Sequence, residues 1–404
     1  MPKFLKTIFI YFFGNVFAKL ISILLLPLYT NYITPSDFGY YDFITTIIGV
    51  IVPVCFVEIW SGVLRYMYDS QEEVYKRKVF ATGIFLAGTL SIVFVFLFIG
   101  INHFIQFRSP GLIFLYALLV MIQNIYQSAV RGLGKNKLFV YSGITSSLGL
   151  VLTNIILISY LNLGLNGLLL SLCLSTFISI LLLEIWGKLL ISIKFNDVDF
   201  KLMKNMFLYC SPLIINSASY WFLAAFNRIV IINEMGVDYN GIYAIASRFS
   251  SALNIFISVF TLAWQESAFS SSSSNNRSLY YTKTINLYIK FLGGGMLVLI
   301  PLTYLIFPYF TTSAYAGASS IIPLTYLGTL ASALSSFLGQ IFGAEKKTKG
   351  IFYTTICGSV VSVVAVFTLI PYLGLHAAAL SVFLGFFVTT IARVYYLNKS
   401  LQIK

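Results

Sequence analysis

Residues 76–101 read KRKVFATGIFLAGTLSIVFVFLFIGI, three basic residues followed by 23 residues without a charge. A helix rises 1.5 Å per residue, so about 20 apolar residues cross the roughly 30 Å of hydrocarbon in a bilayer. Basic residues beside a transmembrane helix favour the cytoplasmic side. The stretch therefore predicts a membrane-spanning helix with its Lys-Arg-Lys end in the cytoplasm.

Eleven further apolar spans of similar length lie on either side of this one. The twelve predicted spans are 8–33, 38–63, 79–101, 110–130, 138–160, 165–187, 207–232, 240–264, 285–310, 317–342, 351–371 and 374–397. Of the 26 Lys and Arg residues, 20 lie in the two termini and the even-numbered connections, and one, Arg108, lies in an odd-numbered connection. We therefore expect an all-α, multi-pass integral membrane protein of about twelve transmembrane helices, with both termini cytoplasmic.

The composition agrees with a membrane protein and argues against several other classes. Hydrophobic residues make up 58% of the chain, charged residues 10%, and the mean hydropathy is +0.88. The net charge of +13 falls mostly in the predicted cytoplasmic connections, which indicates topology and attraction to anionic headgroups rather than nucleic-acid binding. The four cysteines and two histidines show no metal-ligand or disulfide spacing, and no phosphate-binding loop is present, so we expect no metal, no cofactor and no enzyme.

The chain matches itself at about half its length. The paired segments are 37–41 with 238–243, 131–135 with 342–346, and 163–171 with 373–381, and in the first pair Gly39 and Tyr41 align with Gly241 and Tyr243. Six helices in each half bring both halves into the membrane from the same side, the parallel repeat of some alternating-access transporters. We predict an N-lobe at 1–187, a cytoplasmic linker at 188–206 and a C-lobe at 207–404, arranged pseudo-symmetrically around a central cavity.

Polar side chains inside the spans mark the surfaces that face a cavity or a neighbouring helix, because a polar group in hydrocarbon is costly. Lys19 and Arg248 are the deepest basic residues, roughly 16 and 12 Å from the nearer span end at 1.5 Å per residue, and we expect both to face water. Arg228 lies nearer the outer end and fits either a cavity or the headgroups. Lys290 and Arg393 lie close to the cytoplasmic ends, where we expect them to snorkel to the headgroups.

Several segments resemble Wzx-type polysaccharide flippases, the oligosaccharide-exporter branch of the superfamily that includes multidrug exporters. They are Pro27 and Thr30 followed by ITPSDFGYY (33–41), GVLRY (62–66), residues 237–246 and residues 373–381. The resemblance runs across essentially the whole chain. It implies six plus six helices around an often cationic cavity, and movement of an undecaprenyl-pyrophosphate-linked oligosaccharide from the inner to the outer leaflet. The related lipid II flippases carry two further helices.

We therefore expect a flippase of the bacterial plasma membrane that supplies O-antigen, capsule or a similar polymer, with the bilayer, the lipid-linked glycan and the polysaccharide polymerase machinery as partners. The expected phosphate-binding residues are Lys19, Arg248 and Arg228, and the expected sugar-binding residues are Asn15, Gln123, Asn124, Asn216, Tyr220, Ser247 and Asn254. Asp42 or Glu58 could bind H+ or Na+ for energy coupling, or could be structural partners of nearby cations. A multidrug exporter, which would favour an acidic cavity, and a membrane glycosyltransferase or ligase remain the alternatives.

Overall fold

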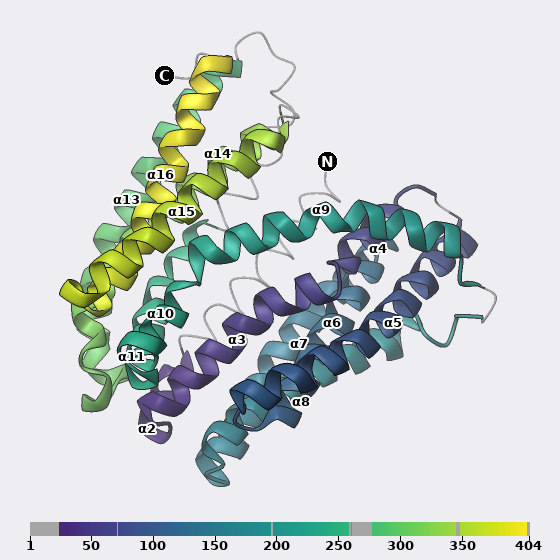
Figure 1. Cartoon of the computed structure of the whole chain (residues 1–404), viewed down its shortest axis with the longest axis horizontal. Helices are drawn as coiled ribbons and strands as arrows, with labels where there is room; N and C mark the ends of the chain where they lie inside the picture. The colour runs from purple at the N-terminus through teal and green to yellow at the C-terminus, as the bar shows by residue number, and fades with distance from the viewer. Residues whose placement is uncertain are drawn as a thin grey trace. The chain divides into compact units, whose positions relative to one another are not determined.

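The computed structural model describes residues 24–70, 72–194, 197–257, 260, 277–344 and 348–401, and every regular element in these ranges is helical (Figure 1). The α-helices are α2 (Leu26–Tyr32), α3 (Pro35–Cys55), α4 (Ile59–Met67), α5 (Glu73–Ile105), α6 (Pro110–Gly132), α7 (Asn136–Asn154), α8 (Gly164–Gly187), α9 (Phe200–Ala224), α10 (Asn227–Glu234), α11 (Val237–Ser250), α13 (Arg277–Phe310), α14 (Ala318–Ala344), α15 (Thr348–Leu373) and α16 (Leu375–Leu401). A π-helical turn, η1 (Ile155–Tyr160), continues α7, and a 3₁₀ turn, η3 (Ser313–Tyr315), precedes α14.

The described residues contain nine helices long and apolar enough to cross a membrane, and a tenth span if α9 and α10 are one bent helix. The third to sixth and the ninth to twelfth predicted spans coincide with single helices, α7 being extended by η1. The described residues include only part of two predicted spans. They contain the end of the first span, which forms α2, and the first part of the eighth, which begins with α11. The multi-pass helical membrane fold is confirmed, and the count of twelve stays a prediction.

Two predicted spans are broken. The second, 38–63, becomes α3 and α4, joined by Val57 and Glu58 in the left-handed region at φ of 54° and 50°. A left-handed conformation costs an ordinary residue roughly 1–2 kcal/mol, which the surrounding packing must offset. The seventh, 207–232, becomes α9 and α10, which meet at a bend of 46°. Hydropathy predicts the length of a span but does not predict where its helix breaks.

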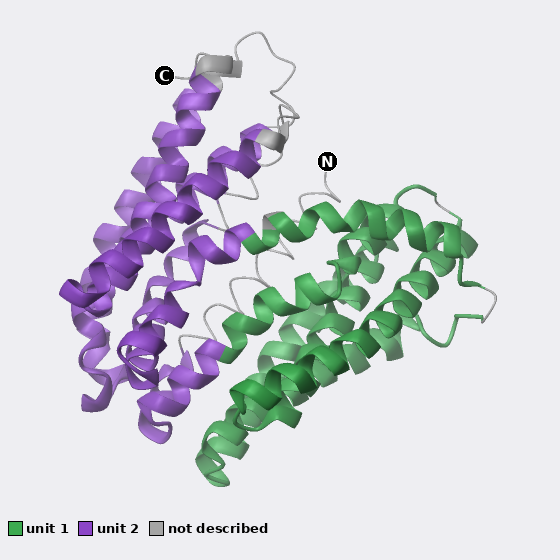
Figure 2. Cartoon of the chain, in the orientation of Figure 1, with its two compact units in different colours: residues 1–14, 44–218 green, residues 15–43, 219–404 purple. Residues whose placement is uncertain are grey.

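The chain divides into two compact units (Figure 2). Among the described residues, unit 1 holds those of 44–218 and unit 2 those of 24–43 and 219–401. In unit 1, α6 packs against α4 and α8, and α7 packs along α8. In unit 2, α16 packs against α14 and α15, and α11 against α14. Residues 24–43 belong to unit 2 by their contacts, so the repeat-based lobes at 1–187 and 207–404 stay a prediction about the internal repeat rather than a description of packing.

Helix α5 shows how the fold meets its surroundings. Ile92, Phe96 and Ile99 lie on one face of the helix and expose 61%, 71% and 61% of their surface. Apolar side chains exposed along a whole helix face would be unfavourable in water, whereas hydrocarbon solvates them. This face of α5 therefore faces lipid, and the polar chemistry of the chain has to be sought inside the units.

Candidate functional site

A cavity of about 230 Å³ lies inside unit 2. Its lining residues are Tyr220 and Ala224 from α9, Arg228 from α10, Tyr243, Ser247 and Ser250 from α11, Ser251 and Asn254 after it, Thr325, Gly328, Thr329 and Ser332 from α14, and Ala379, Val382 and Phe386 from α16. Hydroxyl and amide groups dominate this lining, with one cation and no Asp or Glu among the lining residues that the structure describes. Such a surface offers hydrogen bonds to many hydroxyl groups and a charge to one anion.

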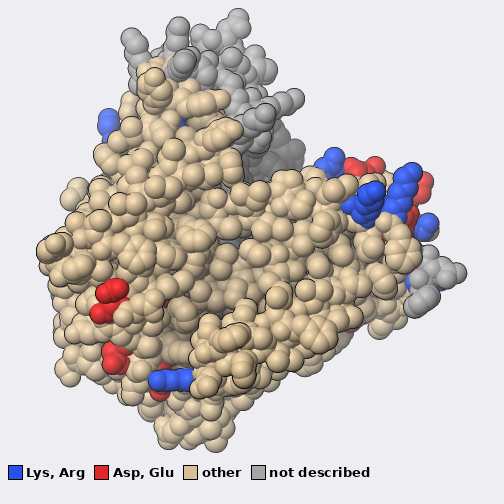
Figure 3. Space-filling view, in the orientation of Figure 1, with Lys and Arg blue, Asp and Glu red and all other residues tan. Residues whose placement is uncertain are grey.

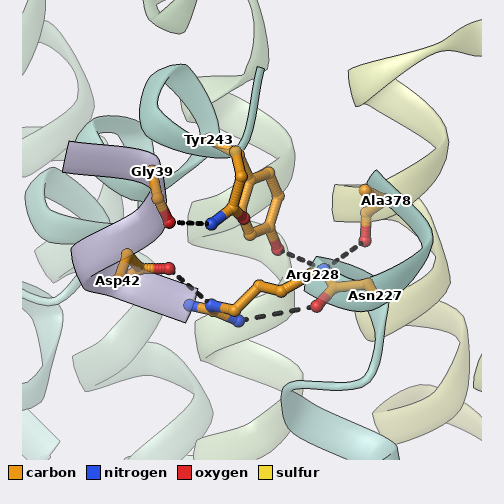
Figure 4. Close-up of polar contacts among 7 residues, drawn as sticks. Gly39, Asp42, Asn227, Arg228, Tyr243 and Ala378 are labelled. Atoms are coloured by element: carbon orange, nitrogen blue, oxygen red, sulfur yellow. Dashed lines mark hydrogen bonds and ion pairs between the residues drawn. The ribbon is translucent and has the colours of Figure 1, made fainter. Parts of the chain in front are cut away.

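The cation of the lining, Arg228, is held by polar contacts to neighbouring side chains (Figure 4). Its Nε donates to Asp42 Oδ2 at 2.8 Å, and its guanidinium carbon lies 5.4 Å from the centre of the Tyr243 ring. The Arg228 and Asp42 side chains expose only 14% and 11% of their surface. An ion pair in such surroundings stabilises both charges, while the planar guanidinium still presents other donors.

Asn227 fixes the position of the arginine next to it. Its Nδ2 donates to the Tyr243 hydroxyl at 2.8 Å and to the Ala378 carbonyl at 3.2 Å, so one side chain ties α10 to α11 and α16 (Figure 4). Asn227 is buried, and a buried amide is stable only when it is hydrogen-bonded. The bonds of Asn227 therefore hold the first turn of α10, and with it Arg228, at the cavity.

The two glycines that align in the internal repeat touch each other. Asn240 Nδ2 donates to the Gly39 carbonyl at 2.7 Å, and a Cβ added to Gly39 would lie 2.6 Å from the Gly241 nitrogen and closer still to the Val237 carbonyl oxygen. A Cβ added to Gly241 would likewise meet the Pro35 carbonyl group. The starts of α3 and α11 are thus in backbone contact, which only glycine permits at both positions. This contact keeps Asp42 within reach of Arg228.

Arg248, the other predicted phosphate-binding arginine, lies in the last turn of α11. Its guanidinium carbon is 5.9 Å from the centre of the Phe38 ring, and the Tyr41 hydroxyl is within hydrogen-bonding range. Asp42 acts electrostatically on Arg248 as well as on Arg228. Arg248 is not among the residues that line the cavity. The structure therefore places Arg228 and Arg248 in reach of the same carboxylate, Asp42, and Arg228 is the one that lines the cavity.

The structure brings some of the other predicted residues to the cavity and leaves others apart. Tyr220, Ser247 and Asn254 line it. Gln123 and Asn124 lie half-buried on α6 of unit 1. Asn15, Lys19 and the side chain of Asn216 lie outside the described residues.

Glu58, the other predicted coupling residue, lies in unit 1 at the break between α3 and α4. Its carboxylate accepts hydrogen bonds from the Ser61 hydroxyl at 3.4 Å and the Ser217 hydroxyl at 3.0 Å. Asp42, in contrast, is the partner of a cation, which is one of the two roles that the sequence left open for it.

Sequence analysis missed the polar residues of α14. Thr325, Thr329 and Ser332 recur at spacings of four and three, so they share one helix face, and that face borders the cavity. Ser247, Ser251 and Asn254 recur at the same spacings of four and three, so this pattern is a signal from which the α14 wall could have been predicted. Asn227 was visible as a polar residue in a span, but nothing in the sequence shows that it bonds two other helices.

Arg393 corrects a prediction. It was expected to snorkel to the headgroups, yet it is buried at 6% exposure between α14, α15 and α16. Its Nε donates to Thr354 Oγ1 at 3.2 Å, its Nη2 to Thr355 Oγ1 at 3.0 Å, and its Nη1 to the Ser335 hydroxyl at 3.1 Å and the Ser335 carbonyl. Lys290 is exposed, as expected for a snorkelling residue. The difference arises because hydroxyl-rich helices surround Arg393 and can solvate its charge within the protein.

The family and the fold of the chain can now be compared with those of known proteins. A family model described as polysaccharide biosynthesis protein matches residues 4–264, more than half of the chain. The chain belongs to this family. A comparison with curated protein sequences gives no match.

Solved structures show the same fold at low sequence identity. An inward-facing multidrug resistance MATE family transporter of the MOP superfamily is 14% identical with a TM-score of 0.76, covering 96% of this chain and 94% of its own. The lipid II flippase MurJ in an inward closed conformation is 15% identical with a TM-score of 0.72, covering 96% and 87%. An outward-facing MATE family transporter has a TM-score of 0.65 at 15% identity, covering 98% and 96%. The chain is therefore a polysaccharide biosynthesis protein with the fold seen in these MATE family transporters and in the lipid II flippase MurJ.

Proposed function

We propose that this protein flips undecaprenyl-pyrophosphate-linked oligosaccharide repeat units from the inner to the outer leaflet of the bacterial plasma membrane, for O-antigen, capsule or a similar polymer. The observation that carries the proposal is the cavity of unit 2, which combines hydroxyl and amide groups with a single guanidinium and has no carboxylate in its described lining. The hydroxyl and amide groups can form hydrogen bonds with a glycan, and the guanidinium can bind a pyrophosphate. Membership of a polysaccharide biosynthesis family supports the same substrate class.

Within the proposed mechanism, Arg228 exchanges partners. In the present structure it pairs with Asp42, which lies on α3 and far away in the sequence. A pyrophosphate that enters the cavity offers the guanidinium a second, more highly charged acceptor. Lys19 and Arg248 are further proposed phosphate-binding residues, and Asn15, Gln123, Asn124 and Asn216 are further proposed sugar-binding residues.

Asp42 gives this exchange a route to energy coupling. Protonation of Asp42 would remove its charge, weaken its bond to Arg228 and leave the guanidinium to the substrate. H+ coupling through Asp42 is therefore part of the proposal. Glu58, which accepts bonds from two serine hydroxyls, is the second candidate for binding H+ or Na+.

The contact between the starts of α3 and α11 supplies the proposed gate. By the positive-inside rule, the basic connections favour an external position for these helix starts and a cytoplasmic position for both termini. Closure of the glycine contact would seal the cavity from outside, and its separation would open the cavity there and draw Asp42 away from Arg228. Alternating access then includes making and breaking one backbone contact between the two copies of the repeated segment.

The test is transport by the purified protein in proteoliposomes. We expect lipid-linked oligosaccharide added to one leaflet to reach the other, chemically unchanged by mass spectrometry, while a cationic drug is not moved. Drug movement without glycan movement would overturn the proposal in favour of a multidrug exporter, to which the MATE fold also corresponds. A covalent change in the glycan would point to a glycosyltransferase or ligase. Retention of a polysaccharide polymerase by the tagged protein in detergent tests the proposed partner.

Orientation is tested in intact cells of the host. A cysteine introduced at Asp238 should react with an impermeant thiol reagent from outside, and one introduced at Lys201 only after permeabilisation. The reverse labelling would contradict cytoplasmic termini.

A further inference from the structure

A second cavity, of about 270 Å³, lies in unit 1 between the ends of α4, α5, α6 and α8. Its lining residues are Met67, Glu73, Lys76, Arg77, Phe80, Leu133, Lys135, Gly187, Lys188, Leu189 and Ser192. The apolar part of this lining includes Met67 and Phe80, both buried. Four cations and one carboxylate supply the charge.

Two of the cations also complete helix ends. Lys76 Nζ donates to the Gly132 carbonyl at the end of α6, and Lys135 Nζ donates to the Gly187 carbonyl at the end of α8, each at 3.2 Å. A cation is favourable at a helix C-terminus, so these bonds fix the ammonium groups in place. A lysine ammonium carries three donors, and the bond to Gly187 uses one of those on Lys135. The cavity therefore has preorganised positive charge.

The acidic groups nearby are engaged in the local structure. Arg77 Nε donates to Asp197 Oδ2 at 2.7 Å, and the Lys194 backbone N–H together with Arg77 lowers the pKa of Asp197 below its ordinary value. Glu184 accepts the backbone N–H groups of Leu190 and Ile191, which folds the chain after α8 back over the helix end. Glu184 does not line the cavity. Of the four lining cations, one is balanced by Glu73 and Arg77 is paired with Asp197, so the lining keeps an excess of two positive charges.

The cavity lies at the level of lipid headgroups. Trp186, two residues before Lys188, exposes 62% of its surface and meets the exposed Tyr141 edge-on, with 6.3 Å between ring centres. Exposed Trp and Tyr side chains are typical of the membrane–water interface. Figure 3 shows Lys, Arg, Asp and Glu gathered over the α4–α5 connection and the start of α9, at the end of unit 1 that the basic connections assign to the cytoplasm.

We propose that this cavity binds the phosphate headgroup of an anionic phospholipid from the cytoplasmic leaflet. Basic cavities between transmembrane helices on the cytoplasmic side suit such headgroups, and an excess of two positive charges fits a headgroup with two phosphodiesters. The cavity lies wholly in unit 1, apart from the polar cavity of unit 2, so the two sites use different residues. The bound lipid would hold together the ends of four helices.

Lipid binding to purified protein variants tests the site. The probe is diphosphatidylglycerol titrated into protein in nanodiscs of neutral phosphatidylcholine, with bound lipid counted by native mass spectrometry. Lys188→Gln removes one charge of the lining and retains a side chain of similar length at φ +53°. Because one lysine near a membrane surface contributes about 1 kcal/mol, we expect the apparent affinity to fall about fivefold.

Lys137→Gln is the matched control, since Lys137 is exposed at the start of α7, two residues from Lys135, and is not part of the lining. It removes the same charge at the same membrane surface and should leave the affinity close to the parent value. Equal losses in the two variants would show general surface attraction and overturn the site. Displacement of the lipid by inorganic pyrophosphate at equal concentration would overturn the assignment to a lipid. Thermal melting in the absence of diphosphatidylglycerol checks that each variant is folded.

Discussion

Two arginines of unit 2 show what separates a substrate-binding candidate from a structural charge. Arg228 lines a polar cavity and pairs with a carboxylate from a segment distant in the sequence. Arg393 is packed among α14, α15 and α16, and its bonds go to two threonines and a serine on the neighbouring helices. A buried cation in a membrane helix is therefore not evidence of a substrate site by itself. The cavity and the exchangeable partner are what distinguish Arg228.

The largest effect on transport is expected at the backbone contact between the starts of α3 and α11, which keeps Asp42 close to Arg228. Gly241→Val should abolish transport, because its Cβ would lie 2.8 Å from the Pro35 carbonyl carbon and no side-chain movement can relieve a clash with backbone. The variant should still insert into the membrane. Gly49→Val on α3 is the control, as nothing lies within 4 Å of its Cβ, and it should transport normally. Normal transport by Gly241→Val would remove the gate from the account.

The next largest effect is expected from replacing Arg393, and it should lower the stability of the folded protein rather than transport. Arg393→Ala empties a packed site, and large-to-small changes of this kind cost about 2–5 kcal/mol. We expect a lower melting temperature in detergent but normal transport per folded molecule. Arg393→Met, which refills most of the volume, should recover the loss, and Lys290→Ala at an exposed position should melt like the parent. A stable Arg393→Ala variant with no transport would make Arg393 functional and break the comparison.

Asp42→Asn tests the role of Arg228 by changing the carboxylate with which it pairs. Without the carboxylate, Arg228 is available to the substrate, and because a hydrogen bond to a charged group contributes about 1.5 kcal/mol or more, the affinity for lipid-linked pyrophosphate should rise about tenfold. Isothermal titration in nanodiscs measures it, with Asp37→Asn in the first turn of the same helix as the charge control. A weaker affinity in Asp42→Asn would mean that Asp42 positions Arg228 instead of competing for it.

The smallest effect belongs to one hydroxyl of the cavity. Ser332→Ala should lower the transport rate about threefold, the value of one ordinary hydrogen bond of about 0.7 kcal/mol. Ser336→Ala, at an exposed position one turn further along the same face of α14 and outside the cavity lining, should leave the rate unchanged. Equal rates for both variants would indicate that this wall does not contact the glycan.

The sequence predicted the helices and part of the site for identifiable reasons. Hydropathy located α5 and α8 because a span must be long and uncharged, and the repeat led to Gly39 and Gly241 because close backbone approach requires glycine in both copies. The break at Val57 and Glu58 was not predicted, since hydropathy does not depend on backbone conformation.

Arg228 and Arg393 show a second reason why part of the structure could not be predicted from the sequence. Depth along a span was the only available guide, and it misplaced Arg393, whose surroundings come from two other helices. The same guide left Arg228 undecided between headgroups and a cavity, because its ion pair joins residues 186 positions apart.

Binding of the lipid-linked oligosaccharide pyrophosphate to Arg228→Gln and Arg393→Met, measured side by side in nanodiscs at equal folded concentration, tests the central claim most directly. The account predicts that Arg228→Gln binds at least about tenfold more weakly than the parent, as expected for the loss of a charge-assisted bond, while Arg393→Met binds like the parent. Parental affinity in Arg228→Gln, or a loss confined to Arg393→Met, would contradict it.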